Sequence, residues 1–286
     1  MLQLVGTGGL CGGMFEMTIN FEKVPAYIRR EIDPPRSVVK KGVRGLSVKR
    51  IQEWLNFHNC RTGIDGQFGP ATEACVKDFQ RLKRRSPTGR VDDAVWNLLV
   101  EPMTAALKAP GKVGALTLQE SVLAVADQHV NRHPVEIGGA NRGPWVRLYC
   151  RGNDGDHWAW CAGFVTLVMH QAYFYRGIRP PIKGSVSCDT LAAQAKEAGL
   201  FVTERELTSG RRAWSDFDAA CIFLRRRTAT DWTHTGIATA GVGKPHELVF
   251  STIEGNTNDE GVREGFEACR RKRGVAGGVY DFIAFA

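Results

Sequence analysis

The chain has 286 residues, of which 43% are hydrophobic and 24% are charged, with a formal net charge of +8. This length accommodates about two ordinary domains, each with its own buried core. No apolar run approaches the roughly 18–20 residues that a membrane-spanning helix requires, so we expect no membrane span. The positive charge implies attraction to polyanions. The basic runs, including residues 270–273, lack interleaved aromatic residues; we interpret them as solvated faces and expect no nucleic acid as partner.

Residues 1–36 show no strong periodicity and end in Asp33-Pro34-Pro35, a stretch that cannot continue a helix. We interpret them as an extended N-terminal arm. The first residues lack a cationic leader and a sustained apolar stretch, which argues against a secretory signal peptide. We therefore expect the protein to be made without a signal peptide and to stay in the cytoplasm until something else releases it.

Residues 37–101 are predicted to form three short helices around one small core. Ser47 is predicted to cap the first helix and Thr72 the second, because apolar residues follow each of them at helical spacing. The loop between these helices contains several glycines, which suit a tight turn. The expected core residues include Val48, Ile51, Leu55, Phe68, Val76, Phe79, Val95 and Trp96.

The order and spacing of residues 41–100 resemble the three-helix peptidoglycan-binding domain of many cell-wall hydrolases. The most specific part is Asp65-Gly66-Gln67-Phe68-Gly69-Pro70-Ala71-Thr72, followed by Gly89, Val91 and Trp96. The resemblance implies peptidoglycan as the partner. We take Asp65 as a possible substrate-binding residue, although the closing of its own loop through backbone N–H groups is the simpler role.

Residues 102–116, with two prolines and a glycine, are interpreted as a linker. Beyond it, residues 117–286 predict helices first and an antiparallel sheet afterwards, which is an α+β arrangement with a helix packed on the sheet. The predicted helices cover about 121–131, 145–149, 161–175 and 191–198, and the predicted strands cover 220–224, 235–239, 248–253 and 280–285.

Cys161 is predicted to stand at the start of a helix, where the partial positive charge of the helix end favours the thiolate. His234, on a predicted strand, could complete a thiolate–imidazolium pair and later give its proton to a leaving amine. Glu254 and Asn256 are two residues apart, so on a strand they share a face, and either could orient His234. The backbone N–H of Cys161 is a natural donor to an oxyanion.

Four segments of residues 117–286 resemble the CHAP branch of the CHAP and NlpC/P60-like, papain-fold peptidoglycan hydrolases. They are Asn141-Arg142-Gly143-Pro144, Trp160-Cys161-Ala162-Gly163-Phe164-Val165, His234-Thr235-Gly236-Ile237 and Ile253-Glu254-Gly255-Asn256. The resemblance implies a papain-like cysteine amidase or peptidase domain. It assigns Cys161 as nucleophile, His234 as base, Glu254 as third member and Asn256 as a supporting polar group, and we add Trp160 as a substrate-binding residue. One departure is Thr233, where such families often carry glycine before the histidine.

Together the two resemblances predict a monomeric, endolysin-like enzyme that hydrolyses an amide of peptidoglycan and acts on the cell wall after release. The bond is either the N-acetylmuramoyl-L-alanine amide, which we narrowly favour, or a peptide bond of the stem or cross-link. The alternatives are an injected antibacterial amidase toxin and a non-catalytic wall-binding protein.

Two other groups suggest metal sites, and we predict no metal at either. His129 and His133 are four residues apart, as in zinc-binding helices, but Val130 occupies the position of the required glutamate. Asn153-Asp154-Gly155-Asp156 resembles part of a calcium loop without the closing glutamate, so we favour a solvated turn, with calcium near Asp154 and Asp156 as the minor alternative.

The other cysteines are scattered and form no Cys-x-x-Cys pair, which disfavours zinc ribbons and thioredoxin-type motifs. We expect most of them to be reduced and buried as small hydrophobic residues, with Cys75, Cys188 and Cys221 as the best examples.

Overall fold

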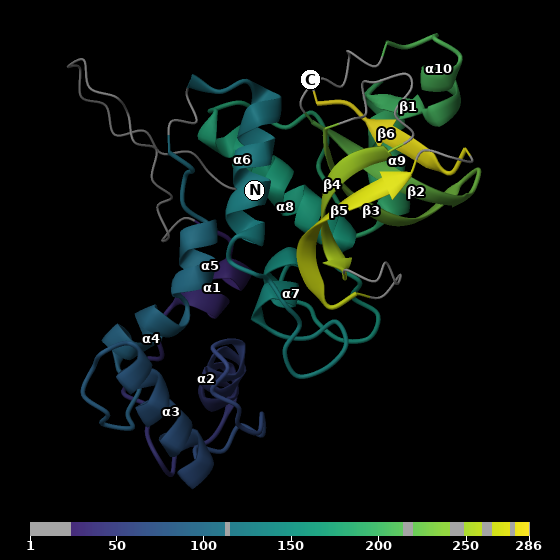
Figure 1. Cartoon of the computed structure of the whole chain (residues 1–286). Helices are drawn as coiled ribbons and strands as arrows, with labels where there is room; N and C mark the ends of the chain where they lie inside the picture. The colour runs from purple at the N-terminus through teal and green to yellow at the C-terminus, as the bar shows by residue number, and fades with distance from the viewer. Residues whose placement is uncertain are drawn as a thin grey trace, which may run out of the picture.

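A computed structural model describes residues 24–111, 115–213, 220–240, 249–258, 265–274 and 278–285 (Figure 1). The described residues form helices and one antiparallel sheet, so the predicted α+β class is confirmed. The helices are α1 (Ala26–Ile32), α2 (Leu46–Phe57), α3 (Pro70–Leu82), α4 (Asp93–Leu99), α5 (Glu101–Ala106), α6 (Leu118–Val130), α7 (Pro144–Tyr149), α8 (Cys161–Tyr175), α9 (Cys188–Glu197) and α10 (Glu204–Thr208). The strands are β1 (Phe201–Thr203), β2 (Cys221–Thr228), β3 (Asp231–Ala240), β4 (Val249–Thr257), β5 (Glu267–Gly274) and β6 (Tyr280–Ile283).

Helices α2, α3 and α4 form a small module at one end of the molecule, below the sheet in Figure 1. Its predicted core residues are buried. The predicted caps are wrong, because α2 begins after Gly45 and α3 after Gly69, and neither N-cap residue offers a side chain. Gly45 has φ of +116°, a conformation that favours glycine. Thr72 lies inside α3, where its hydroxyl accepts a hydrogen bond from Gln52 (3.1 Å).

The prediction of an extended arm over residues 1–36 is wrong for α1, and residues 1–23 lie outside the described part. Ile28 and Ile32, one helical turn apart, bury their side chains. The indole N–H of Trp96, from α4, donates to the carbonyl oxygen of Ile32 (2.7 Å). A seven-residue helix carries too few periodic positions to stand out in the sequence, and its contacts with the rest of the molecule stabilise it.

The predicted linker over residues 102–116 begins with a packed helix. Pro102 occupies the first turn of α5, where its missing N–H costs no helical hydrogen bond. Met103 and Ala106 are fully buried, and Gln128 of α6 donates to the carbonyl oxygens of Ala105 and Ala106 (2.9 Å each). The segment therefore packs against α6 instead of acting as a free spacer.

The small module contacts the rest of the chain through a buried ionic cluster centred on Arg147 of α7. Its guanidinium donates to Glu31 (Nε–Oε1, 2.8 Å), to Glu53 (Nη2–Oε2, 2.6 Å) and to Asp154 (Nη1–Oδ2, 2.9 Å). One arginine thus joins carboxylates from α1, from α2 and from the loop after α7. A buried guanidinium with several carboxylates depends on each partner, because loss of one leaves an unpaired buried charge.

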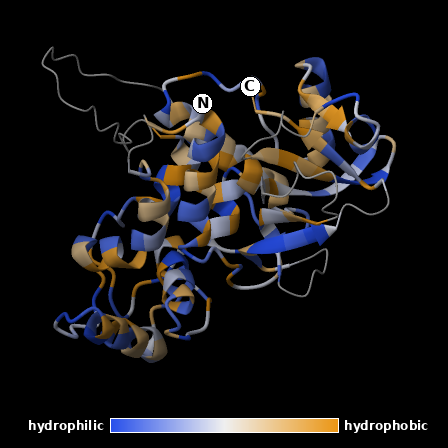
Figure 2. Cartoon of the chain, turned by 45° about the horizontal axis from the view of Figure 1, so that its top comes forward, coloured by the Kyte–Doolittle hydropathy of each residue, from blue (hydrophilic) through white to orange (hydrophobic). Residues whose placement is uncertain are grey.

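The strands form one antiparallel sheet in the order β1-β6-β2-β3-β4-β5. Helices α6 and α8 pack on one face, and α9 contacts β3 and β1. A second apolar cluster, which includes Phe223, Phe250 and Phe282, fills the other face. Figure 2 shows hydrophobic residues concentrated where the central helices meet the sheet.

Strand β5 was not predicted, because it contains the basic run at residues 270–273. The run lies at the edge of the sheet, where charged side chains are tolerated and block further strand pairing. Its interpretation as a purely solvated face is wrong for Arg273, whose side chain reaches a buried carboxylate described below. No helix in the described part of the chain is long and apolar enough to cross a membrane.

Candidate active site

Cys161 is the first residue of α8, and 4% of its surface is exposed. Trp160 precedes it as N-cap without a side-chain cap, so the first backbone N–H groups of the helix keep their partial positive charge near the sulfur. Gly163 allows this placement, because a Cβ there would lie 2.4 Å from the carbonyl oxygen of Tyr149. The close contact between α7 and α8 therefore fixes where the thiol stands.

His234 and Glu254 come from neighbouring strands, β3 and β4, and form a buried hydrogen bond between Nε2 and Oε2 (2.7 Å). Cys161 also lies close enough to His234 to raise the pKa of its imidazole. Since Nε2 is occupied by Glu254, Nδ1 is the ring nitrogen left for the thiol. Gly236 makes room for this arrangement, because a Cβ there would lie 2.7 Å from Cγ of Glu254. The structure thus brings Cys161, His234 and Glu254 into one chain of contacts.

Arg273 and Thr252 hold the carboxylate of Glu254, and neither was identified from the sequence. Arg273 donates from Nε to Oε1 (2.8 Å) and from a terminal nitrogen to Oε2, and the Thr252 hydroxyl donates to Oε1 (2.5 Å). Burial alone raises the pKa of Glu254, but the bonds from Arg273 and His234 outweigh it and bring the pKa to about 2. Glu254 is therefore ionised at neutral pH, although it is fully buried.

The same contacts set the protonation of His234 and Cys161. Burial lowers the pKa of His234, but its hydrogen bonds to Cys161 and Glu254 more than offset this and raise it to about 9. A hydrogen bond from Cys188 lowers the pKa of Cys161 well below its ordinary value, and His234 and the backbone N–H of Thr235 lower it further against the opposing effect of burial. Both shifts favour a thiolate beside an imidazolium, which is the charge state that a cysteine nucleophile with a proton donor requires.

Cys188 is the free, buried thiol that the sequence predicts, but it also contacts the sulfur of Cys161. It is the first residue of α9, and its sulfur lies 3.9 Å from that of Cys161. Its hydrogen bond to the Cys161 thiolate, together with burial, raises the pKa of Cys188 well above its ordinary value. The sequence gave no sign of this contact, because a separation of 27 residues along the chain says nothing about distance in space.

Asn256 lies on the same strand as Glu254, but only Glu254 contacts His234. The pairing of β4 with β5 shifts register between Glu254 and Thr257, and Asn256 adopts a φ of +55° within this irregularity. Its side-chain oxygen is buried and has no hydrogen-bond partner among the described residues. The irregular backbone explains why the regular alternation of a strand does not place the two side chains alike.

Trp160 and Asp65, the two residues assigned to substrate binding, both make hydrogen bonds within the protein. Trp160 is fully buried, stacks on Tyr149 (5.3 Å between ring centroids) and donates from its indole to Glu136 (2.9 Å), so it positions the start of α8. Asp65 is exposed, but it accepts hydrogen bonds from the side chain of Gln52 and from the backbone N–H of Gln67 (2.8 Å each), as expected for the closing of its own loop.

The residues weighed as metal ligands have protein partners. The ring nitrogens of His129 contact Tyr149 and Gln171 (3.0 Å each). Asp154 accepts from Arg147, and Asp156 lies 3.6 Å from Arg142. Across the described ranges, no group of three or more His, Cys, Asp or Glu side chains is arranged to hold a metal ion.

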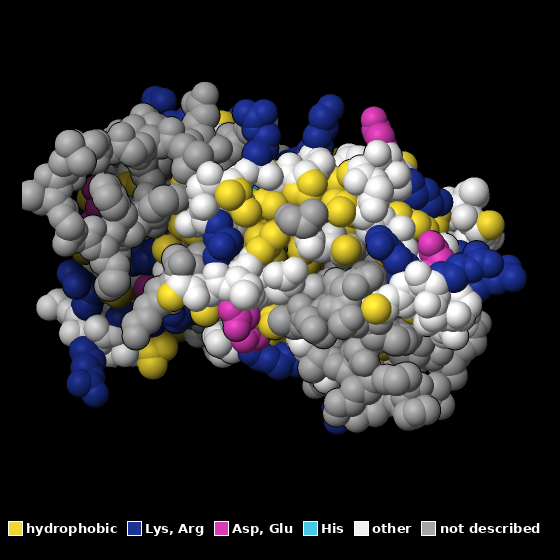
Figure 3. Space-filling view, turned by 90° about the horizontal axis from the view of Figure 1, so that it is seen from above, with side chains coloured by type: hydrophobic (Ala, Val, Ile, Leu, Met, Phe, Trp, Pro, Cys, Tyr) yellow, Lys and Arg dark blue, Asp and Glu magenta, His cyan; other side chains and the backbone are white. Residues whose placement is uncertain are grey.

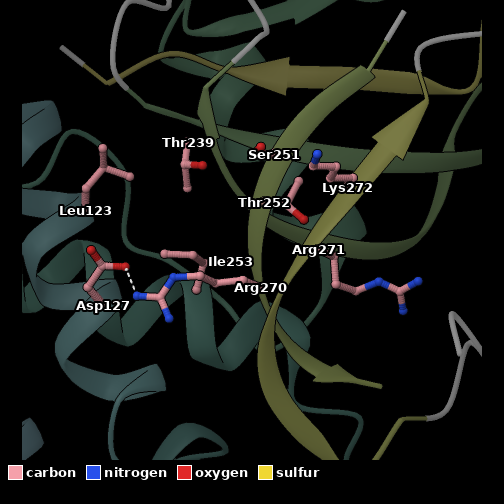
Figure 4. Close-up of a pocket in the computed structure, with 9 residues that line it drawn as sticks. All are labelled: Leu123, Asp127, Thr239, Ser251, Thr252, Ile253, Arg270, Arg271 and Lys272. Carbon is pink, nitrogen blue, oxygen red and sulfur yellow. Dashed lines mark hydrogen bonds and ion pairs between the residues drawn. The ribbon is translucent and has the colours of Figure 1, made fainter. Parts of the chain in front are cut away.

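A pocket of about 480 Å³ lies between α6 and strands β4 and β5 (Figure 4). Its basic side is formed by Arg270, Arg271 and Lys272, and Arg270 pairs with Asp127 of α6 across it (2.7 Å). Cys161 and His234 do not line this pocket. It meets the site only through Thr252, which lines the pocket and also hydrogen-bonds to Glu254.

Comparison with known families identifies one part of the chain. Residues 44–99 match the family model described as "Putative peptidoglycan binding domain". The chain carries a peptidoglycan-binding domain. The match falls on α2, α3 and α4 and within the predicted limits of 37–101, and it supports peptidoglycan as a partner. A search of the curated proteins found no match.

Proposed function

We propose that the protein is an endolysin-like peptidoglycan hydrolase that cleaves an amide bond with Cys161 as nucleophile, in a papain-like domain of the CHAP type. The observation that carries the proposal is the contact chain from Cys161 through His234 to Glu254. Structural cysteines are typically packed as thiols among apolar groups, whereas this sulfur stands at a helix N-terminus beside a cationic imidazole.

The geometry supports an acyl-transfer sequence. The Cys161 sulfur attacks the amide carbonyl carbon and forms a C–S bond, and His234 gives its proton to the nitrogen as the C–N bond breaks. A water molecule then attacks the thioester, His234 takes its proton, and the C–S bond breaks to release the acid. The first backbone N–H groups of α8 are suited to stabilise the oxyanion that forms in both steps.

Glu254 and Arg273 support this sequence through His234. The hydrogen bond at Nε2 fixes the ring so that its other nitrogen faces the thiol, and the ionised carboxylate stabilises the imidazolium. Arg273 keeps that carboxylate ionised in a buried position. Both are positioning residues, because they act on the reaction through His234.

The domain at residues 44–99 supports peptidoglycan as the polymer that carries the bond. It packs against the rest of the chain through the Arg147 cluster, so binding to the wall would hold Cys161 near its substrate and raise its effective concentration there. Figure 3 shows many Lys and Arg side chains and few Asp and Glu on one face, in keeping with an anionic polymer as partner. We accordingly propose the cell wall as the place of action.

The test compares the wild type with Cys161→Ala on purified sacculi, with Cys75→Ala as a control that removes a partly exposed thiol of the small module. We expect Cys161→Ala to bind sacculi normally and to release no soluble fragments, while the control keeps full activity. Equal fragment release by Cys161→Ala would refute the nucleophile. Binding without fragment release by the wild type would favour the non-catalytic wall-binding alternative.

Mass analysis of the fragments identifies the bond. We expect intact glycan strands with new amino termini on L-alanine, as an N-acetylmuramoyl-L-alanine amidase produces. Cleaved stems or cross-links would instead establish an endopeptidase, and new reducing sugar ends would contradict a cysteine mechanism altogether.

A further inference from the structure

The two thiols at 3.9 Å, Cys161 and Cys188, form a pair that the proposed hydrolytic sequence does not use. Each is the first residue of a helix, α8 and α9, so the partial positive charges of two helix ends meet at the sulfurs. Both side chains are buried, with exposed fractions of 4% for Cys161 and 7% for Cys188. All seven cysteines in the described ranges are free thiols.

We propose that Cys188 has two roles: its S–H stabilises the Cys161 thiolate, and it is the resolving thiol that converts an oxidised Cys161 into a reversible Cys161–Cys188 disulfide. The effect of this disulfide on hydrolysis rests on the proposed function, whereas its formation does not. Formation of the disulfide would bring the sulfurs from 3.9 Å to about 2 Å.

The oxidation balances with hydrogen peroxide as the oxidant. The Cys161 thiolate attacks one peroxide oxygen, the O–O bond breaks, and the products are the sulfenic acid and hydroxide. The Cys188 sulfur then attacks the sulfenic sulfur, an S–S bond forms, and the S–O bond breaks. The hydroxyl group leaves as water with the proton of Cys188, so two thiols lose two electrons and the peroxide is reduced.

The disulfide would block Cys161 as a nucleophile and would also protect its sulfur from further oxidation. A sulfenic acid without a nearby thiol proceeds to sulfinic and sulfonic acids, which thiol reductants do not restore. With Cys188 at contact distance, the disulfide forms first, and a dithiol reductant returns both thiols. Cys150 and Cys221 are poorer partners, because the Cys150 thiol donates to the carbonyl oxygen of Trp158 (3.6 Å) and Cys221 lies with the apolar cluster on the far face of the sheet.

Two substitutions separate the roles. Cys188→Ser keeps a hydrogen-bond donor but cannot form a disulfide, whereas Cys188→Ala loses both. The full-length wild type and both variants are treated with hydrogen peroxide and then with dithiothreitol. Peptide mapping by mass spectrometry follows the cysteines, and alkylation rates with iodoacetamide across pH follow the thiolate of Cys161.

For the wild type we expect a Cys161–Cys188 linked peptide that dithiothreitol removes, with recovery of the alkylation rate. For both variants we expect sulfinic or sulfonic acid at Cys161 and no recovery. Before oxidation, Cys188→Ala should alkylate at acidic pH about tenfold more slowly than the wild type, and Cys188→Ser should stay close to it. A merely structural role would not shift this pH profile.

Absence of the linked peptide in the wild type, or equal recovery of Cys188→Ser, would overturn the resolving role. Identical alkylation profiles for the wild type and Cys188→Ala would overturn the stabilising role. These readouts need no hydrolysis, so failure of this inference is distinguishable from failure of the proposed function, which the sacculus assay tests alone.

Discussion

The bond between Arg273 and Glu254 provides the most direct test of the site, and the change is Arg273→Met. The arginine makes two hydrogen bonds to a carboxylate with no exposed surface, and methionine keeps much of its apolar length. Without the guanidinium, a buried carboxylate keeps only His234 and Thr252 as partners. The cost of removing one partner of a buried pair is large, because the remaining charge loses its compensation.

The magnitude follows from the pKa of Glu254. Its ordinary value is 4.5 and its value in the folded protein is about 2. At about 1.4 kcal/mol per pKa unit, this difference corresponds to about 3 kcal/mol of folding stability at neutral pH, of which Arg273 supplies the largest favourable part. Because the folded-state pKa is lowered, this stabilisation is present above pH 4.5 and is lost as the pH falls toward about 2.

The assay is urea unfolding followed by tryptophan fluorescence at several pH values. We expect Arg273→Met to lower the free energy of unfolding by about 2–3 kcal/mol at neutral pH and to flatten its fall between pH 4.5 and about 2. Arg270→Met is the matched control, because Arg270 lies on the same strand in an exposed ion pair worth about 0–1 kcal/mol. Adding Glu254→Gln to Arg273→Met should recover much of the loss.

If Arg273→Met unfolds no more easily than Arg270→Met, Arg273 does not hold Glu254 ionised. The same conclusion would follow if the double variant lost as much unfolding free energy as Arg273→Met alone, since Glu254→Gln removes the unpaired buried charge.

Three further predictions follow from the site and its supports. Hydrolysis should decline as the pH rises through about 9, because His234 then loses the proton that it gives to the leaving amine; initial rates on sacculi across pH test this, and a rate that stays constant to higher pH would contradict it. Gly255→Ala should lower stability by about 1–3 kcal/mol, because the new Cβ would lie 2.7 Å from Cβ of Phe164 in α8; Gly63→Ala, with open space around it, is the control, and equal melting temperatures would refute the close contact. Arg147→Met should cost about 3–5 kcal/mol and loosen the small module, which limited proteolysis would detect as new cleavage between the module and α6.

Much of the architecture could be predicted from local sequence. The α8 helix is predicted over 161–175, and the structure gives it the same limits, because a predominantly apolar segment of helical length specifies a buried helix on its own. The strands at β2, β3, β4 and β6 were also found, since β-branched and aromatic residues between turns specify strands locally. Helix α1 and strand β5 were missed, because a short segment and a basic segment carry no such pattern and depend on their neighbours.

The sequence by itself determined which residues could do chemistry. Cys161, His234 and the pair Glu254 and Asn256 follow from residue type, order and the expected helix start, and the family resemblance at residues 41–100 required only local spacing. Residue type, order and local spacing are features of single segments, so the sequence of each segment is enough to detect them. The tertiary structure decided which of Glu254 and Asn256 orients the histidine, because a register shift between β4 and β5 turns the backbone at that point.

Only the tertiary structure decided the partners that come from distant segments. Arg273 contacts Glu254 because β5 pairs with β4. Cys188 contacts Cys161 because the N-termini of α8 and α9 lie side by side. In the sequence one was part of a basic run and the other an ordinary buried cysteine. Charge and reactivity of a buried group depend on the groups within a few ångströms of it, and that neighbourhood is set by packing between segments whose separation along the chain says nothing about their distance.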